Sequence, residues 1–124
     1  MVGWDISRQF AVIEPADAEA LRALGTPLAV FCMDIQRMVS AFCATETHLA
    51  GFDLPDPIAM AVALDPGVAT DVRHLHVAVE TQGRYCRGQS VVDHLAITGA
   101  PANARVVLAA DRQRFLAMLR RAIA

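Results

Sequence analysis

The chain has 124 residues, of which 55% are hydrophobic and 19% charged, and its formal net charge is −2. This length is typical of one domain and allows a sizeable hydrophobic core. The high apolar fraction with low net charge excludes disorder as the main state. A pI of about 6.0 argues against a basic nucleic-acid binder. The mean hydropathy of +0.37 is high for a small soluble monomer, which predicts surface that another structure covers.

The sequence gives no sign of a membrane span or of a secretory leader. The longest uninterrupted apolar run, Ile58–Leu64, is about a third of the ~20 residues that a membrane span needs. Met1–Asp5 has neither the basic stretch nor the apolar core of a signal peptide. Cys32, Cys43 and Cys86 form no C-x-x-C pair, which fits free thiols in a reducing compartment. We expect a cytoplasmic protein that contacts neither membrane nor nucleic acid.

The chain begins with a predicted strand and a predicted helix. Val2–Ile6 is short and partly apolar, as strands often are. Glu14-Pro15 then begins a helix over residues 16–24, since proline suits the first helical position and Gly25 supplies a C-terminal stop.

Two further helices are predicted before the middle of the chain. Thr26-Pro27 begins the first, which runs from Leu28 to about Cys43 with one broad buried face. Its apolar residues recur at steps of three and four: Leu28, Phe31, Ile35, Met38, Val39 and Phe42. After a polar connection over 44–54, Asp56-Pro57 begins the second, with Asp56 as N-cap. Its core, residues 58–64, is apolar on every face, so this helix should lie inside a larger body.

The second half of the chain predicts strands followed by one helix. The elements expected in order are a strand over 72–79 buried on both faces, a turn at 82–84, an extended stretch over 88–96, a loop over 98–103, a strand over 105–109 and a helix capped by Asp111. The whole pattern is typical of an α/β protein.

Few side chains stand out as chemical groups. His74-x-His76 places two imidazoles on one strand face, but no third ligand is evident, so structural histidines are favoured over a metal site. Asp93 and His94 are neighbours on a strand and point to opposite faces, which disfavours an acid–base pair. Asp56 is more telling because it lies at the mouth of the apolar helix. It is either a plain N-cap or an oxygen ligand for a hard cation.

Three segments together carry a family resemblance. They are Phe52-Asp-Leu-Pro-Asp-Pro-Ile-Ala-Met-Ala-Val-Ala-Leu-Asp-Pro66, Val79-Glu-Thr-Gln-Gly-Arg-Tyr-Cys-Arg-Gly-Gln-Ser-Val-Val-Asp93 and Asp111-Arg-Gln-Arg-Phe115. With the opening Val2–Arg8, they resemble the C-terminal part of the inosine–uridine-preferring nucleoside hydrolase family, in the right order over essentially the whole chain. The resemblance implies the C-terminal part of a Rossmann-like mixed sheet with flanking helices, in a single, partial domain over residues 1–124.

The resemblance also implies a chemistry. Members of this family cleave the N-glycosidic bond of ribonucleosides with a deeply bound Ca²⁺ that holds the ribose hydroxyls and a water. Asp56 matches the family's C-terminal calcium-ligating aspartate. The helix over 28–43 and the loop after it border the base pocket in the family, which makes Phe42 and His48 substrate-binding candidates. A core phenylalanine and a solvated histidine are the alternatives.

Two departures from the family pattern limit the expected activity. Pro55 stands where many members have the histidine that protonates the leaving base, and proline cannot donate a proton. The family's N-terminal aspartate cluster, which supplies most calcium ligands and the base, has no match here. The chain alone is therefore expected not to hydrolyse nucleosides. It resembles a truncated reading frame, a split-enzyme partner or a remnant, which would act on a nucleoside only when an N-terminal half completes it.

Other interpretations remain open. The chain fits a non-catalytic α/β module for oligomerisation or small-molecule binding, since an uncovered apolar face favours self-association. It also fits an independent small α/β domain. An upstream aspartate cluster would favour the enzyme.

Overall fold

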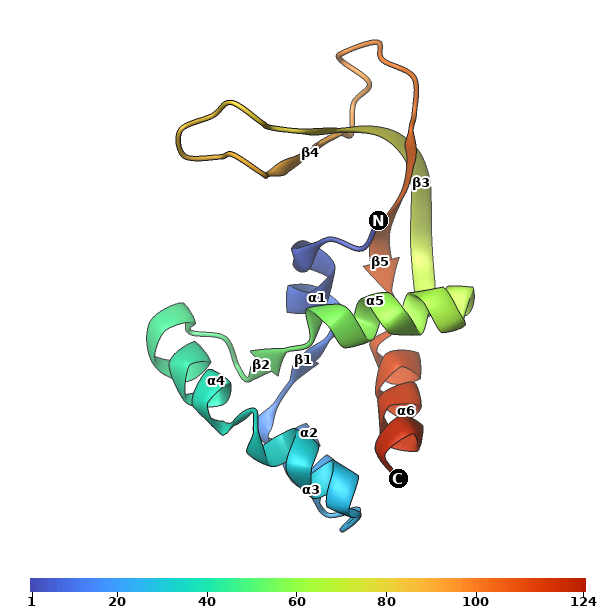
Figure 1. Ribbon diagram of the computed structural model, residues 1–124. Helices are drawn as coiled ribbons and strands as arrows, with labels where there is room; N and C mark the ends of the chain where they lie inside the picture. Colours follow the sequence, from blue (N-terminus) through green and yellow to red (C-terminus); the bar gives the residue numbers. More distant parts are fainter.

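Helices and short strands alternate along the chain in the computed structural model, which describes all residues 1–124 (Figure 1). The elements are α1 (Trp4–Phe10), β1 (Val12–Ile13), α2 (Pro15–Arg22), α3 (Pro27–Asp34), α4 (Arg37–Phe42), the π-helical turn η1 (Cys43–Thr47), β2 (Phe52–Asp53), α5 (Pro55–Leu64), the 3₁₀ turn η2 (Pro66–Val68), β3 (Ala69–Val79), β4 (Ser90–Asp93), β5 (Ala104–Ala110) and α6 (Arg112–Ile123).

Two antiparallel sheets organise these elements. The larger has the strand order β4-β3-β5, and the smaller pairs β1 with β2, with Ile13 opposite Phe52. The β3–β4 hairpin projects from one end of the molecule, while α2 and α3 lie at the opposite end (Figure 1). Directly before β5 begins, the side chain of Asn103 continues the pairing with β3, accepting from Val77 N at 2.8 Å and donating to Val77 O at 3.0 Å.

A cluster of 15 buried hydrophobic residues joins the helices to β1, β2 and β5. Polar contacts close this core at its ends. The guanidinium of Arg112 at the start of α6 donates to Val12 O at 3.0 Å and to Asp17 Oδ2 at 2.6 Å. Thr26 caps α3 and donates to Ile123 O at 2.6 Å, so the last helix holds the early part of the chain in place.

The predicted strand over Val2–Ile6 is wrong, because α1 occupies most of it. Gly3 is the extended N-cap, Asp5 lies in the first turn and Ile6 is buried. An acid in the first turn favours a helix start, and that signal outweighs a short apolar run. Strand-like pairing is confined to Met1, whose N donates to Arg105 O at 2.7 Å and whose O accepts from Val107 N at 3.0 Å.

The predicted buried face of the helix over 28–43 is also wrong within this chain. The helical stretch is divided into α3 and α4 at Ile35 and Gln36, and its apolar stripe faces solvent. The exposed fractions are Leu28 49%, Phe31 61%, Ile35 53%, Met38 84%, Val39 46% and Phe42 58%. Ala29, Met33 and Cys43 are buried instead. The 3.6-residue period identifies an apolar face but not what covers it.

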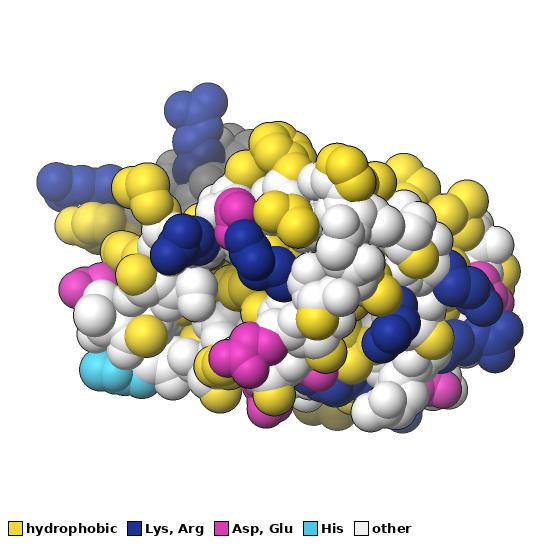
Figure 2. All heavy atoms as spheres, turned by 90° about the horizontal axis from the view of Figure 1, so that it is seen from below, with side chains coloured by type: hydrophobic (Ala, Val, Ile, Leu, Met, Phe, Trp, Pro, Cys, Tyr) yellow, Lys and Arg dark blue, Asp and Glu magenta, His cyan; other side chains and the backbone are white.

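By length and composition, the stretch Pro27–Thr47 is also a helix that could cross a membrane. This is weak evidence, since a core helix of a soluble protein meets the same criterion. Hydrophobic side chains lie openly on the face of the molecule seen in Figure 2, several of them side by side along its upper rim.

Two expectations about the middle of the chain need correction. Leu54, not Asp56, is the N-cap of α5, since Pro55 and Pro57 both suit the first turn and the helix begins two residues earlier than predicted. The strand predicted to be buried on both faces, β3, has no buried residue, and α5 buries only Ile58 and Ala61.

Several other elements match the predictions. The helix over 16–24 corresponds to α2, and the strands over 72–79 and 105–109 correspond to β3 and β5. Asp111 caps α6 as expected, accepting from Arg114 N at 3.0 Å. These elements have a strong local start signal or a run of β-branched residues, so their secondary structure depends least on contacts with other elements.

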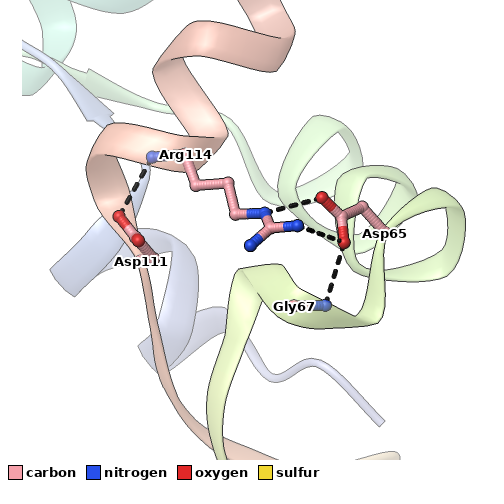
Figure 3. Close-up of polar contacts among 4 residues, drawn as sticks. All are labelled: Asp65, Gly67, Asp111 and Arg114. Atoms are coloured by element: carbon pink, nitrogen blue, oxygen red, sulfur yellow. Dashed lines mark hydrogen bonds and ion pairs between the residues drawn. The ribbon is translucent and has the colours of Figure 1, made fainter.

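Asp65 and Arg114 join the end of α5 to α6 (Figure 3). Arg114 Nε donates to Asp65 Oδ2 at 2.6 Å and its Nη2 donates to Oδ1 at 2.9 Å, while Gly67 N donates to Oδ1 at 3.0 Å. The hydrogen bond from Arg114, opposed by desolvation and assisted by Gly67, lowers the pKa of Asp65 below its usual 3.8.

This pair predicts acid-sensitive stability. Because the folded-state pKa of Asp65 is lowered, its contribution is complete above the ordinary pKa and is lost as the pH falls through the lowered pKa. The melting temperature should fall between about pH 5 and about pH 2, and Asp65→Asn should flatten that fall. Asp71→Asn, at the exposed pair with Arg73 on β3, is the control and should leave the profile unchanged. Equal slopes for wild type and Asp65→Asn would contradict the assignment.

Candidate functional site

The candidate site is built on the short connection from β2 to α5. Asp53, the last residue of β2, accepts from Trp4 Nε1 at 2.9 Å and from Ser7 Oγ at 2.7 Å. Ser7 is completely buried within α1. A charge-assisted contact to a buried hydroxyl is stronger than an ordinary surface hydrogen bond. The backbone that leads into α5 is therefore anchored to α1.

Asp56 lies three residues after this anchor, in the first turn of α5. Its side chain is exposed and makes no capping hydrogen bond and no ion pair with any residue of the chain. The N-terminal end of a helix favours negative charge. Its oxygens are free to bind a group from outside the chain.

Phe42 and His48 lie at the two ends of η1. Phe42 ends α4 with an exposed ring, so the alternative of a core phenylalanine does not hold within this chain. His48 is exposed and has a left-handed backbone, with φ of 53° and ψ of 30°, where the π-helical turn ends. Thr47 Oγ1 donates to Cys43 O at 3.1 Å and helps to close that turn. No hydrogen bond joins either side chain to Asp56, which follows on the next helix.

The residues of this chain do not by themselves fit a Ca²⁺ ion. No group of three or more His, Cys, Asp or Glu side chains lies close enough to hold a metal. Ca²⁺ takes six to eight oxygen ligands, whereas the candidate site offers the single free carboxylate of Asp56. The chain can supply one ligand to such a site.

Two other polar residues considered from the sequence, His76 and Asp93, have structural partners. The ring Nδ1 of His76 lies 3.0 Å from Pro101 O, within donating distance of that carbonyl. Asp93 accepts from Thr98 Oγ1 at 2.6 Å and from the backbone N–H groups of Ile97 and Thr98, each at 3.0 Å. These contacts, with Thr98 first, lower the pKa of Asp93, so its carboxylate is a turn cap.

The sequence did not point to Asp53 or Ser7. A serine inside a short helix and an aspartate three residues before Asp56 carry no spacing signal of their own. Only the packing of α1 beside the β2–α5 connection brings them together, through sequence separations of 46 and 49 residues.

The fold is that of an α/β protein with two antiparallel sheets and flanking helices. The site has a free carboxylate, Asp56, in the first turn of the apolar helix α5. The family model for inosine–uridine preferring nucleoside hydrolase matches residues 1–117. The chain belongs to this family, as the resemblance predicted.

Relatives and solved structures agree with the family assignment. The pyrimidine-specific ribonucleoside hydrolase RihA of Salmonella typhimurium is 36% identical over 120 residues, which are 96% of this chain and 38% of that protein. The Klebsiella pneumoniae protein of the same name is 34% identical, covering 100% of this chain and 40% of its own length. The structure of a purine-preferring ribonucleoside hydrolase from Gardnerella vaginalis matches 99% of this chain with a TM-score of 0.77 and 28% identity.

An inosine–guanosine nucleoside hydrolase has the same fold, with a TM-score of 0.80 over 97% of this chain at 24% identity. The match covers 37% of that chain. The present chain thus spans about two fifths of the length of the proteins that it resembles, and it corresponds to their C-terminal part.

Proposed function

We propose that this chain supplies the C-terminal part of a ribonucleoside hydrolase, which cleaves the N-glycosidic bond of a nucleoside to ribose and free base. Asp56 carries the proposal: it is a free, exposed carboxylate in the first turn of α5, at the position where the resemblance implies a calcium ligand. The family match over residues 1–117 supports the reaction class.

The residues of this chain have limited and separate roles in the proposal. Asp56 would provide one oxygen ligand to Ca²⁺, and the Asp53–Ser7 contact holds the backbone that presents it. When bound, Ca²⁺ supplies positive charge that orients the ribose hydroxyls and a water. Phe42 offers an exposed aromatic surface for a planar base, and His48 offers an exposed imidazole at the other end of η1. The residue before Asp56 is Pro55, whose side chain cannot donate a proton.

A complementing chain is the partner that the proposal requires. Ca²⁺ needs more oxygen ligands than Asp56 can give, and the family's aspartate cluster has no counterpart here. We expect the chain alone to be inactive. The free cysteines, of which Cys43 is buried and Cys32 half-buried, suit a reducing compartment, and we propose the cytoplasm.

A complementation assay tests the proposed function. The chain would be produced with a polypeptide that covers the remaining N-terminal part of the Salmonella typhimurium relative, and ribose release from inosine and uridine would be measured with excess Ca²⁺. The pair should hydrolyse at least one nucleoside, and each part alone should not. Turnover by the chain alone would overturn the requirement for a partner. A stable pair without turnover would overturn the enzymatic proposal and favour the non-catalytic module.

A further inference from the structure

Four apolar side chains on the outer face of α3 and α4 form a ridge. These residues, Leu28, Phe31, Ile35 and Met38, follow one another at steps of three, four and three, so they share one side of the helical stretch. All four are exposed, Leu28 least at 49% and Met38 most at 84%. Ile35, directly after α3, keeps a right-handed backbone with φ of −67° and ψ of −22°, so the break before α4 does not divide the ridge.

The same helices already bury a different side in the core of this chain. Ala29 and Met33 of α3, and Cys43 directly after α4, belong to the buried hydrophobic cluster. The polar residues of the stretch, among them Asp34 and Arg37, line an open groove of about 600 Å³ against α2. A helix that is apolar on more than one side is typical of the interior of a larger body. The core of this chain covers one of these sides, and the ridge is free to pack against a second structure.

The remaining part of the nucleoside hydrolase fold fits this second structure. This chain covers 38% of the Salmonella typhimurium relative and 38% of the Gardnerella vaginalis structure, so most of each protein lies outside the match. The structural match extends over 99% of this chain, so α3 and α4 lie within the region that the larger fold reproduces. The proposed function requires the same N-terminal part for its calcium ligands, whereas it requires no second copy of this chain.

We infer that the ridge is the docking surface for the N-terminal part of the hydrolase fold. A specific interface takes about 800 Å² from each partner, so four large side chains form its apolar centre and not its whole extent. Phe42 follows Met38 by four residues, so the docked part reaches the edge of the base-binding surface and leaves that ring to the base. The inference rests on the proposed function for the identity of the partner, but pairing is measured without turnover.

Sedimentation equilibrium on the coproduced pair tests the inference. The chain is purified together with the polypeptide used in the complementation assay, and the dissociation constant of the pair is measured without substrate. The double variant Phe31→Glu with Met38→Glu should raise that constant at least about 100-fold, because two apolar anchors become charged. Circular dichroism of the variant chain should show unchanged helix content, because both side chains are exposed. With saturating partner, the variant pair should reach the turnover of the wild-type pair, since neither residue belongs to the proposed site.

The matched control places two charges on the outer face of α6. Gln113→Glu with Ala117→Glu changes exposed positions on a face that also carries Arg120 and Arg121, so this variant should pair as tightly as the wild type.

Several results would overturn the inference. They are a wild-type chain that does not pair, a ridge variant that pairs as tightly as the wild type, and equal weakening by both double variants. A homodimer of the chain that only the ridge variant dissociates, with pairing unchanged, would assign the ridge to a second copy instead. Ridge-dependent binding to vesicles of phosphatidylcholine and phosphatidylglycerol, with pairing unchanged, would assign it to a membrane. A stable wild-type pair without turnover, weakened by the ridge variant, would support the docking surface while overturning the proposed function.

Discussion

Replacing Asp56 by alanine should abolish nucleoside hydrolysis by the complemented pair and lower its Ca²⁺ affinity at least about 100-fold, since a charged ligand is removed from the metal. The side chain has no partner within the chain, so the variant should fold and pair as the wild type does. Isothermal titration calorimetry with Ca²⁺, before any substrate is added, measures the affinity independently of turnover.

Asp5→Ala is the matched control for Asp56→Ala. Asp5 is likewise the acid in the first turn of a helix, α1, and its N-cap also makes no side-chain capping bond. Both variants lose the same favourable interaction with a helix N-terminus, so any common effect belongs to helix stability. If Asp56→Ala keeps the Ca²⁺ affinity of the wild type, or if Asp5→Ala loses as much, Asp56 is not a ligand.

Gly51→Ala should destabilise the folded chain by about 3 kcal/mol, a large fraction of the stability of a small domain. A Cβ atom at this position would lie 2.0 Å from Ile13 O and 2.7 Å from Ile13 C. Both atoms belong to the backbone of β1, which pairs with β2 at Ile13 and Phe52, so neither can move without breaking that pair. Urea unfolding followed by circular dichroism measures the loss.

The control for Gly51→Ala is the same substitution at Gly3. There the new Cβ would approach Asp5 Oδ1 at 2.2 Å, the far end of a flexible side chain that can rotate away. Gly3→Ala should therefore change the free energy of unfolding much less. Equal effects at the two glycines would show that the β1–β2 contact is not what requires Gly51.

The predictable parts of the fold are those fixed by local chemistry. Asp111 and the residues after it define α6, and the β-branched run Val106-Val107 defines β5, without help from elsewhere in the chain. The family resemblance, carried by three separated segments, is confirmed. It identified Asp56 as a candidate ligand, a role that stays a prediction.

The wrong predictions concern elements whose burial depends on neighbouring structure and not on their own residue pattern. The apolar stripe of α3–α4 and the strand β3 have the composition of buried elements, yet this chain leaves the stripe exposed and gives β3 no buried residue. Asp56 as N-cap was wrong for a smaller reason, because two nearby prolines both suited the first turn. The Asp53–Ser7 contact was inaccessible to sequence reasoning, since it depends on packing across 46 residues.

The long reach of the closing contacts has a consequence for how the protein is made. Met1 meets Arg105, Val12 meets Arg112 and Thr26 meets Ile123, across separations of 104, 100 and 97 residues. Contacts of such high sequence separation slow folding, and the second and third cannot form before α6 has been synthesised. These two contacts can therefore form only after residues 1–111 have been synthesised. A ribosome-bound chain that lacks α6 should therefore be cleaved by protease more readily near Val12 and Thr26 than the chain that contains α6.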